Sequence, residues 1–292
     1  MNHQGNTHPF LKTLGFDAGS RVAIFHADDV GMCHGANVAF EELSRLGTIH
    51  CGSVMVPCPW FTEIAELAAA NPSLDLGVHL TLTSEWATYR WAPISTTSRH
   101  SGLIDEYGYF WRRLPMLYTH VIPDAAEEEM RAQIDRALAS GINVTHLDTH
   151  MGAAILPQLI DIYLRLGRDY KLPVLLPKHL KGYTSVLDFE SIPLVGYEAM
   201  IARLEKKGMF LVDHFKMTLN KVDALPVGLT MIALHPNKSG DIEMIVPAKA
   251  HLRTKEYRLL KDSRFPLFVK QLGIQTIGFK PFRDLLRQKT EG

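Results

Sequence analysis

Aspartate and histidine residues stand at the ends of several apolar segments of this sequence. The pair Asp28-Asp29, in "HADDVG", comes directly after the apolar run "RVAIF". Among later apolar runs, His79 lies within one, Asp148 with His150 ends another, Asp213 with His214 lies late in a third, and His235 ends a fourth. A catalytic divalent metal commonly takes three such protein ligands and keeps one position open for water. The residue types therefore indicate metal-assisted chemistry.

The adjacency of Asp28 and Asp29 needs an explanation, because two neighbouring carboxylates repel each other. Successive residues of a regular strand point to opposite faces, so the two need not share a role. Near an irregular strand end, one carboxylate could bind a cation while the other turns toward water, and the cation would relieve the repulsion.

Purely structural interpretations remain open for each residue. An aspartate before a helix is often an N-cap. His79 could be a hydrogen-bonded core histidine, and His235 could simply end a strand. For His146 the structural interpretation is favoured.

The apolar runs alternate with helical patterns along the chain. The predicted strands are 21–27, 50–58, 74–83, 142–150, 172–177, 209–215, 229–236 and 274–279, and the predicted helices are 33–47, 60–70, 124–140, 156–164, 197–207, 247–262 and 282–289. This alternation predicts parallel β/α units, and hence a barrel or a doubly wound sheet. In a barrel the carboxyl ends of the strands open on one face, which would bring the aspartates and histidines together. A glycine-rich GxGxxG turn is absent after the first strand, which disfavours dinucleotide binding.

The sequence contains no internal repeat and no linker. We therefore predict a single domain over residues 21–292, preceded by an N-terminal extension of residues 1–20. Regularity breaks only in a long segment, 84–123, which carries eight Trp, Tyr and Phe residues. Long loops inside compact domains are usually functional or disordered, and the aromatic content argues against disorder.

Charge and cysteine content narrow the function classes. The 292 residues include 31 basic and 31 acidic ones, so nothing indicates a nucleic acid or an anionic membrane surface as partner. The three cysteines form no CxxC pair, and no segment approaches the roughly 20 apolar residues of a membrane span. We expect a cytoplasmic enzyme, and the sequence leaves its oligomeric state open, a homodimer included.

The motifs "HADDVG", "GVHLTLT" and "THLDTH" resemble, in order and spacing, those of the YdjC-like (ChbG-type) carbohydrate deacetylases, relatives of the NodB-type polysaccharide deacetylases. "ALHPNKSGD" is similar to a late motif of that family, and the resemblance spans about residues 20–290. It implies an irregular (β/α) TIM-like barrel and one divalent metal ion, with Mg²⁺ or Zn²⁺ as first choices. By position, Asp29, His79 and His150 would be the metal ligands, Asp28 the catalytic base and His235 a helper at the leaving group or oxyanion.

The function implied by the resemblance is hydrolysis of the acetamido group of an N-acetylated sugar or short oligosaccharide. The chain departs from the family at two places. His26 stands where the family usually has Asn, and "HLDTHMGAA" stops at His150 where the family usually continues with more histidines. The second departure makes the sugar preference harder to infer than metal binding.

Two other functions remain open at this point. One is a metal-dependent phosphoesterase or amidohydrolase on a similar barrel, although such sites commonly carry HxH on the first strand, which here offers two aspartates. The other is a non-catalytic sugar-binding protein with a degenerate site.

Overall fold

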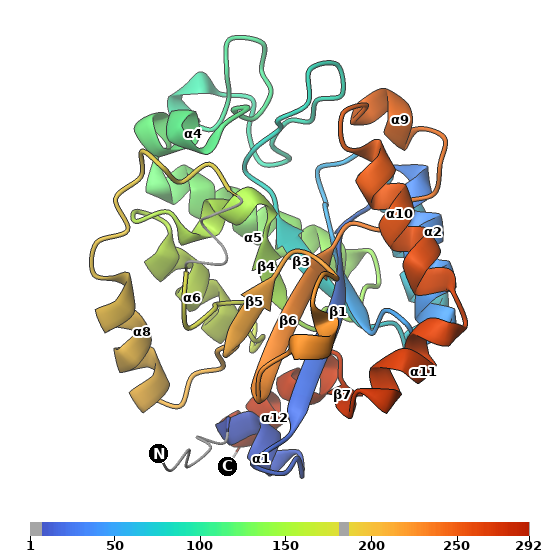
Figure 1. Cartoon of the computed structure of the whole chain (residues 1–292). Coiled ribbons are helices and arrows are strands. Elements are labelled where there is room, and N and C mark those ends of the chain that lie inside the picture. Colours follow the sequence, from blue (N-terminus) through green and yellow to red (C-terminus); the bar gives the residue numbers. More distant parts are fainter. Residues whose placement is uncertain (1–7, 181–186, 292) are drawn as a thin grey trace.

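A single parallel sheet forms the centre of the protein (Figure 1). The computed structural model describes residues 8–180 and 187–291. The seven strands are β1 (Arg21–Val30), β2 (Cys51–Val54), β3 (Leu76–Leu80), β4 (Leu147–Thr149), β5 (His214–Lys216), β6 (Gly228–Leu234) and β7 (Ile274–Thr276). Their order is β4-β3-β2-β1-β6-β5, and β7 pairs with the first residues of β1. All strand pairs are parallel, as the β/α alternation predicts.

The expectation of a TIM-like barrel is only partly met, because the sheet is curled but open. Between β4 and β5 the chain makes isolated parallel bridges, Leu147 with Val174 and Pro177 with Val212, in place of the strand predicted at 172–177. Proline has no N–H to donate to a ladder, and Pro173 and Pro177 bound this apolar run. The fold is therefore an α/β half-barrel.

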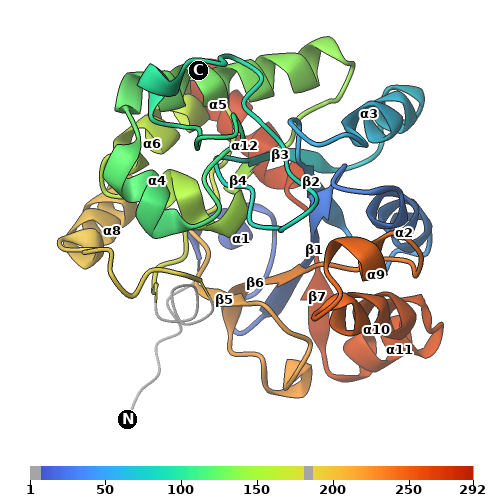
Figure 2. The same cartoon turned by 90° about the horizontal axis from the view of Figure 1, so that it is seen from above.

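Helices cover the outer face of the curled sheet (Figure 2). They are α2 (His34–Arg45), α3 (Phe61–Ala70), α5 (Pro123–Ala139), α6 (Ile160–Asp169), α8 (Tyr197–Lys206), α10 (Ala250–Lys261) and α11 (Arg264–Gln271). The short helices α4 (Leu114–His120) and α9 (Ile242–Ile245) lie beyond the carboxyl ends of the strands (Figure 1). Two more, α1 (Pro9–Thr13) and α12 (Lys280–Glu291), lie near the amino ends of the strands (Figure 1). No helix within the described residues is long and apolar enough to cross a membrane.

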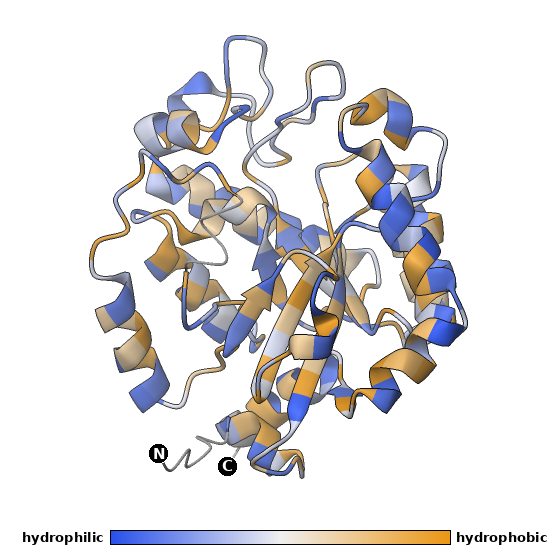
Figure 3. Ribbon diagram, viewed as in Figure 1, coloured by the Kyte–Doolittle hydropathy of each residue, from blue (hydrophilic) through white to orange (hydrophobic). Residues whose placement is uncertain are grey.

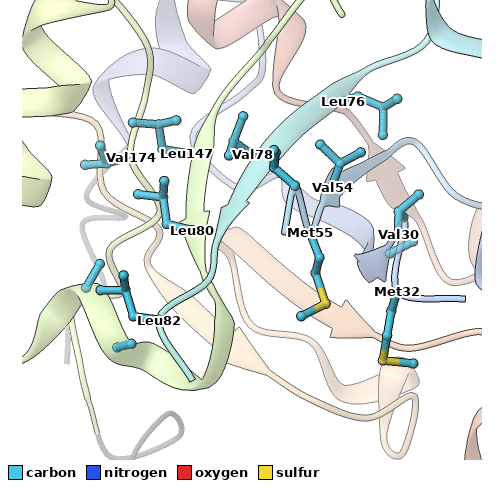
Figure 4. Close-up of a cluster of buried hydrophobic side chains, with 14 of the residues drawn as sticks. Val30, Met32, Val54, Met55, Leu76, Val78, Leu80, Leu82, Leu147 and Val174 are labelled. Carbon is cyan, nitrogen blue, oxygen red and sulfur yellow. The ribbon is translucent and has the colours of Figure 1, made fainter. Parts of the chain in front are cut away.

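Two apolar clusters fill the two faces of the sheet. The larger one packs strand residues such as Val54, Val78 and Leu147 against the surrounding helices (Figure 4). The smaller one lies inside the curl and joins Val22 and Ile24 to Phe10 of α1 and Phe282 of α12. Apolar residues thus predominate in the central strands, while many polar residues lie on the surrounding helices (Figure 3).

The segment 84–123 is ordered by buried polar contacts. The buried Glu129 on α5 accepts hydrogen bonds from the backbone N–H groups of Ile94 and Ser95, and Arg90 pairs with Asp105 at 2.8 Å. The segment also contains α4 and a short 3₁₀ helix, Arg99–Ser101. It lies on the side of the molecule where the carboxyl ends of the strands open (Figure 1).

Glu42 ties α2 to α10 and should make stability depend on pH. Lys261, Tyr257 and Lys238 lower the pKa of Glu42 to about 2. Because this pKa is lowered in the folded state, the stabilisation is full above the unfolded value of about 4.3 and is lost as the pH falls toward 2. We expect Glu42→Gln to lower the free energy of unfolding at pH 7 by about 1 kcal/mol. Denaturant melts at pH 7 and pH 3, with Glu41→Gln as control, test this; a loss of equal size at both pH values would contradict it.

Candidate metal and catalytic site

A bulge at the end of β1 brings both adjacent carboxylates to one place. The pairing of β1 with β2 shifts register between Ala27 and Val30, and Asp29 has a left-handed backbone with a φ of 61°. Aspartate tolerates this conformation better than most residues. The irregularity overrides the strict alternation of side chains, so Asp28 and Asp29 line the same pocket.

Alternation along the other strands brings histidines to the same pocket. The apolar residues of β3 and β4, Val78, Leu80 and Leu147, belong to the outer cluster. His79 therefore points into the curl, and His150, directly after β4, lies beside it with ring centroids 5.3 Å apart. His235, directly after β6, lines the pocket as well.

Asp29, His79 and His150 form a compact, buried set of ligand atoms. His79 Nε2 lies 3.5 Å and His150 Nδ1 lies 3.2 Å from Asp29 Oδ1. Two donors bonded at about 2.0–2.1 Å to one tetrahedral metal are about 3.3 Å apart. Asp29 Oδ1 is also buried and has no hydrogen-bond partner in the described structure. These distances and the unpaired oxygen fit a single divalent cation.

A carboxylate holds the far nitrogen of each of these two histidines. His79 Nδ1 lies 2.9 Å from Asp148 Oδ1 and 3.0 Å from the hydroxyl oxygen of Ser53, which donates to Asp148 Oδ2. His150 Nε2 lies 3.0 Å from Glu85 Oε2. Metal-binding histidines usually donate their second N–H to a carboxylate in this way, which fixes the tautomer and the ring orientation. Asp148 and Glu85 thus direct Nε2 of His79 and Nδ1 of His150 toward Asp29.

Arg253 on α10 neutralises part of the negative charge. Its Nη1 donates to Asp29 Oδ2 at 2.8 Å, which leaves Oδ1 for the two histidines. Burial alone would raise the pKa of Asp29, but Arg253, His150 and His235 outweigh it and hold the pKa well below its ordinary value. Asp29 is therefore ionised, as a metal ligand must be.

Asp28 faces the same pocket on a different side. His26 Nδ1 lies 2.7 Å from its Oδ1, and His235 Nε2 lies 4.0 Å from its Oδ2. The backbone N–H of His235 donates to Glu256, whose pKa burial raises to about 7. Burial and Arg253 lower the pKa of His235, so this ring is neutral at pH 7.

The pocket has a volume of about 430 Å³ and combines these polar groups with apolar walls. Trp86 is the member of the predicted aromatic segment that lines it, together with the apolar Met151, Leu187, Phe215 and Met217. Trp86 also lies under Arg253, whose guanidinium carbon is 6.0 Å from the centre of the indole ring.

One predicted pair lies elsewhere. β5 begins at His214, so Asp213 stands before the strand and not near its end. Asp213 pairs with Lys178 and accepts a hydrogen bond from the N–H of Leu229 near the start of β6, far from the carboxyl ends of the strands. The apolar residues 210–212 are buried core and form no ladder there beyond the one bridge at Val212.

Glu85, Arg253 and Glu256 were not found from the sequence. Arg253 and Glu256 lie three residues apart on α10, where charged residues usually form a solvated face, and Glu85 lies in a segment noted only for its aromatic residues. Their roles depend on which elements pack over the strand ends.

Comparisons with known proteins agree with this architecture. Residues 22–271 match the family model described as YdjC-like protein. A protein of Thermus thermophilus named carbohydrate deacetylase is 41% identical over 172 residues, which are 59% of each chain. A protein of Thermoanaerobacter pseudethanolicus, also named carbohydrate deacetylase, is 27% identical, and the match covers 87% of this chain and 96% of that protein. A crystal structure titled as a putative cellobiose-phosphate cleavage protein from Enterococcus faecalis has the same fold, with a TM-score of 0.72 at 21% identity, covering 90% of this chain and 99% of its own.

Proposed function

This chain belongs to the YdjC-like family, and from that premise we propose that it is a metal-dependent hydrolase that removes the acetyl group from an N-acetylated sugar or short oligosaccharide. The names of its relatives support a deacetylase acting on carbohydrate. The observation that carries the proposal is the juxtaposition of Asp28 with the ligand set Asp29, His79 and His150 in one pocket. A base beside such a set is what amide hydrolysis needs.

Asp29, His79 and His150 would hold the cation, and Mg²⁺ or Zn²⁺ is our first choice. Such an ion lowers the pKa of a bound water and polarises a carbonyl oxygen. The two imidazoles and one carboxylate suit Zn²⁺ chemically, whereas Mg²⁺ prefers oxygen ligands.

Asp28 would act as the general base. His26 occupies its Oδ1, so Oδ2, which faces the pocket toward His235, takes the proton of the attacking water. The bond between the acetyl carbon and the sugar nitrogen then breaks, and acetate and the free amine form.

His235 would return that proton to the departing nitrogen. An amine leaves readily only when it is protonated, and a neutral His235 can accept the proton from Asp28 across the 4.0 Å between them. The same ring then donates to the nitrogen. Trp86 offers an aromatic face in the pocket against which the apolar face of a sugar ring could pack.

Acetate release from a panel of N-acetylated mono- and oligosaccharides tests the proposal. We expect release from at least one member, its loss with a chelator and its return when metal is added back. Release that is insensitive to chelator would refute the metal dependence. Failure to release acetate from every member with metal present would favour a binding protein, and phosphate release from phosphate esters would favour a phosphoesterase.

A further inference from the structure

Below the pocket, a chain of hydrogen bonds runs from Asp28 into the interior of the curled sheet. His26 Nδ1 bonds Asp28 Oδ1 at 2.7 Å, and His26 Nε2 lies 2.8 Å from His146 Nε2. His146 Nδ1 lies 3.0 Å from Thr145 Oγ1, which lies 2.5 Å from Asp75 Oδ1. His26, His146 and Thr145 are completely buried, and Asp75 nearly so.

The chain is closely packed. The ring of His146 stacks on Phe279 at 3.9 Å, and a Cβ added to Gly77 would lie 2.6 Å from that ring. The His26–His146 separation of 2.8 Å is shorter than the roughly 3.3 Å expected between two ligands of a tetrahedral metal, so a proton and not a metal joins the two rings.

Counting protons constrains this chain. Its four links need four protons, while one hydroxyl and two neutral imidazoles supply three. If Asp75 were ionised and both rings neutral, Thr145 would donate to Asp75, and the two remaining protons could not serve the three links from Thr145 through the rings to Asp28. One further proton must therefore reside on Asp75, on one of the rings or on Asp28.

We propose that this proton belongs to Asp75 and that the chain, with every donor directed toward the pocket, positions Asp28 as a proton acceptor. In this arrangement Asp75 donates to Thr145, Thr145 to His146 Nδ1, His146 Nε2–H to His26 Nε2, and His26 Nδ1–H to Asp28 Oδ1. The role of Asp28 as a catalytic base rests on the proposed function, whereas the arrangement of protons along the chain is independent of that function.

The location on Asp75 minimises buried charge. With Asp75 protonated, the chain carries one charge, on Asp28 at the pocket edge; a cationic ring would add a buried cation and a buried carboxylate. Asp75 Oδ2 accepts the N–H of Lys280 at 2.7 Å, which a protonated carboxyl also permits. Burial raises the pKa of Asp75 despite the bonds of Thr145 and Lys280, and burial lowers the pKa of His146. The nearby Arg283 donates to Asp284 and Asn143.

Two spectra of the metal-free, substrate-free protein test the arrangement directly. Nitrogen NMR of isotope-labelled histidine should show His26 protonated on Nδ1 only and His146 on Nε2 only. Infrared spectroscopy should show the band of a protonated, buried carboxyl group that Asp75→Asn removes. A doubly protonated ring, or an ionised Asp75, would overturn the proposal. Neither reading depends on deacetylase activity, so failure of the proposed function remains distinguishable.

Two variants test the positioning role. Thr145→Val cuts the chain outside the pocket, and we expect kcat to fall about 10-fold with KM and metal affinity unchanged and the His26 tautomer no longer fixed. The conservative variant Asp75→Asn keeps a donor for Thr145 and an acceptor for Lys280, and should retain far more turnover than Thr145→Val. Equal losses in the two variants would mean that Asp75 acts as a charge, and a wild-type kcat in Thr145→Val would mean that the chain does not position Asp28; either result refutes the proposal.

Discussion

Asp28→Asn should lower kcat by about 100- to 10,000-fold and leave metal affinity close to that of the wild type. The amide keeps an oxygen that can accept the His26 Nδ1–H bond, so the side chain should stay in place. It cannot take a proton from water, however. The proposed metal ligands Asp29, His79 and His150 are unchanged by the substitution, which is why binding should persist.

The measurement is acetate release under saturating metal, together with calorimetric titration of the metal into the metal-free protein. Asp124→Asn, on the exposed first turn of α5, is the matched control. Near-normal turnover in Asp28→Asn would remove Asp28 from the role of base. Loss of metal in the same variant would make Asp28 a ligand.

His79→Ala and His150→Ala should each weaken metal binding by more than about 100-fold and abolish activity with it. Each substitution removes one of the three proposed ligands and leaves a carboxylate, Asp148 or Glu85, without its imidazole partner. Titration of Co²⁺ followed by its visible spectrum measures the loss. His100→Ala, in an exposed turn, serves as control. Wild-type metal affinity in either histidine variant would show that the cation binds elsewhere.

The same titration should depend on pH in a defined direction. Burial lowers the pKa of His150, but Glu85 and Asp29 outweigh it and raise the pKa to about 10, and Asp148 likewise raises the pKa of His79. The His150 ring therefore carries a second proton at pH 7 in the metal-free protein, and a metal bound there would have to displace it. Metal affinity should rise with pH between 6 and 9. An affinity independent of pH would contradict this protonation.

The sequence predicts the framework of the site better than its surroundings. Asp28, Asp29, His79, His150 and His235 could be grouped because parallel strands share an end and because side chains alternate along a strand. These are local rules that hold for every strand of a parallel sheet.

Other features depend on tertiary packing. The run 172–177 is apolar and buried, like a strand, but its two prolines limit its backbone hydrogen bonds, and it forms only isolated bridges. Arg253 belongs to the site because α10 packs beside α2, which the helical pattern alone does not specify. His26 is similar: its role follows from a contact with His146, 120 positions away.

The bulge at Asp28-Asp29 limits how the site could be transplanted. If the two aspartates were copied onto a regular strand of another protein, one of them would project to the opposite face, among the covering helices. The left-handed backbone at Asp29 would also be missing. A designer would have to transfer the extra residue of the strand as well as the two side chains, so the placement of the two carboxylates in one pocket depends on backbone shape as much as on residue identity.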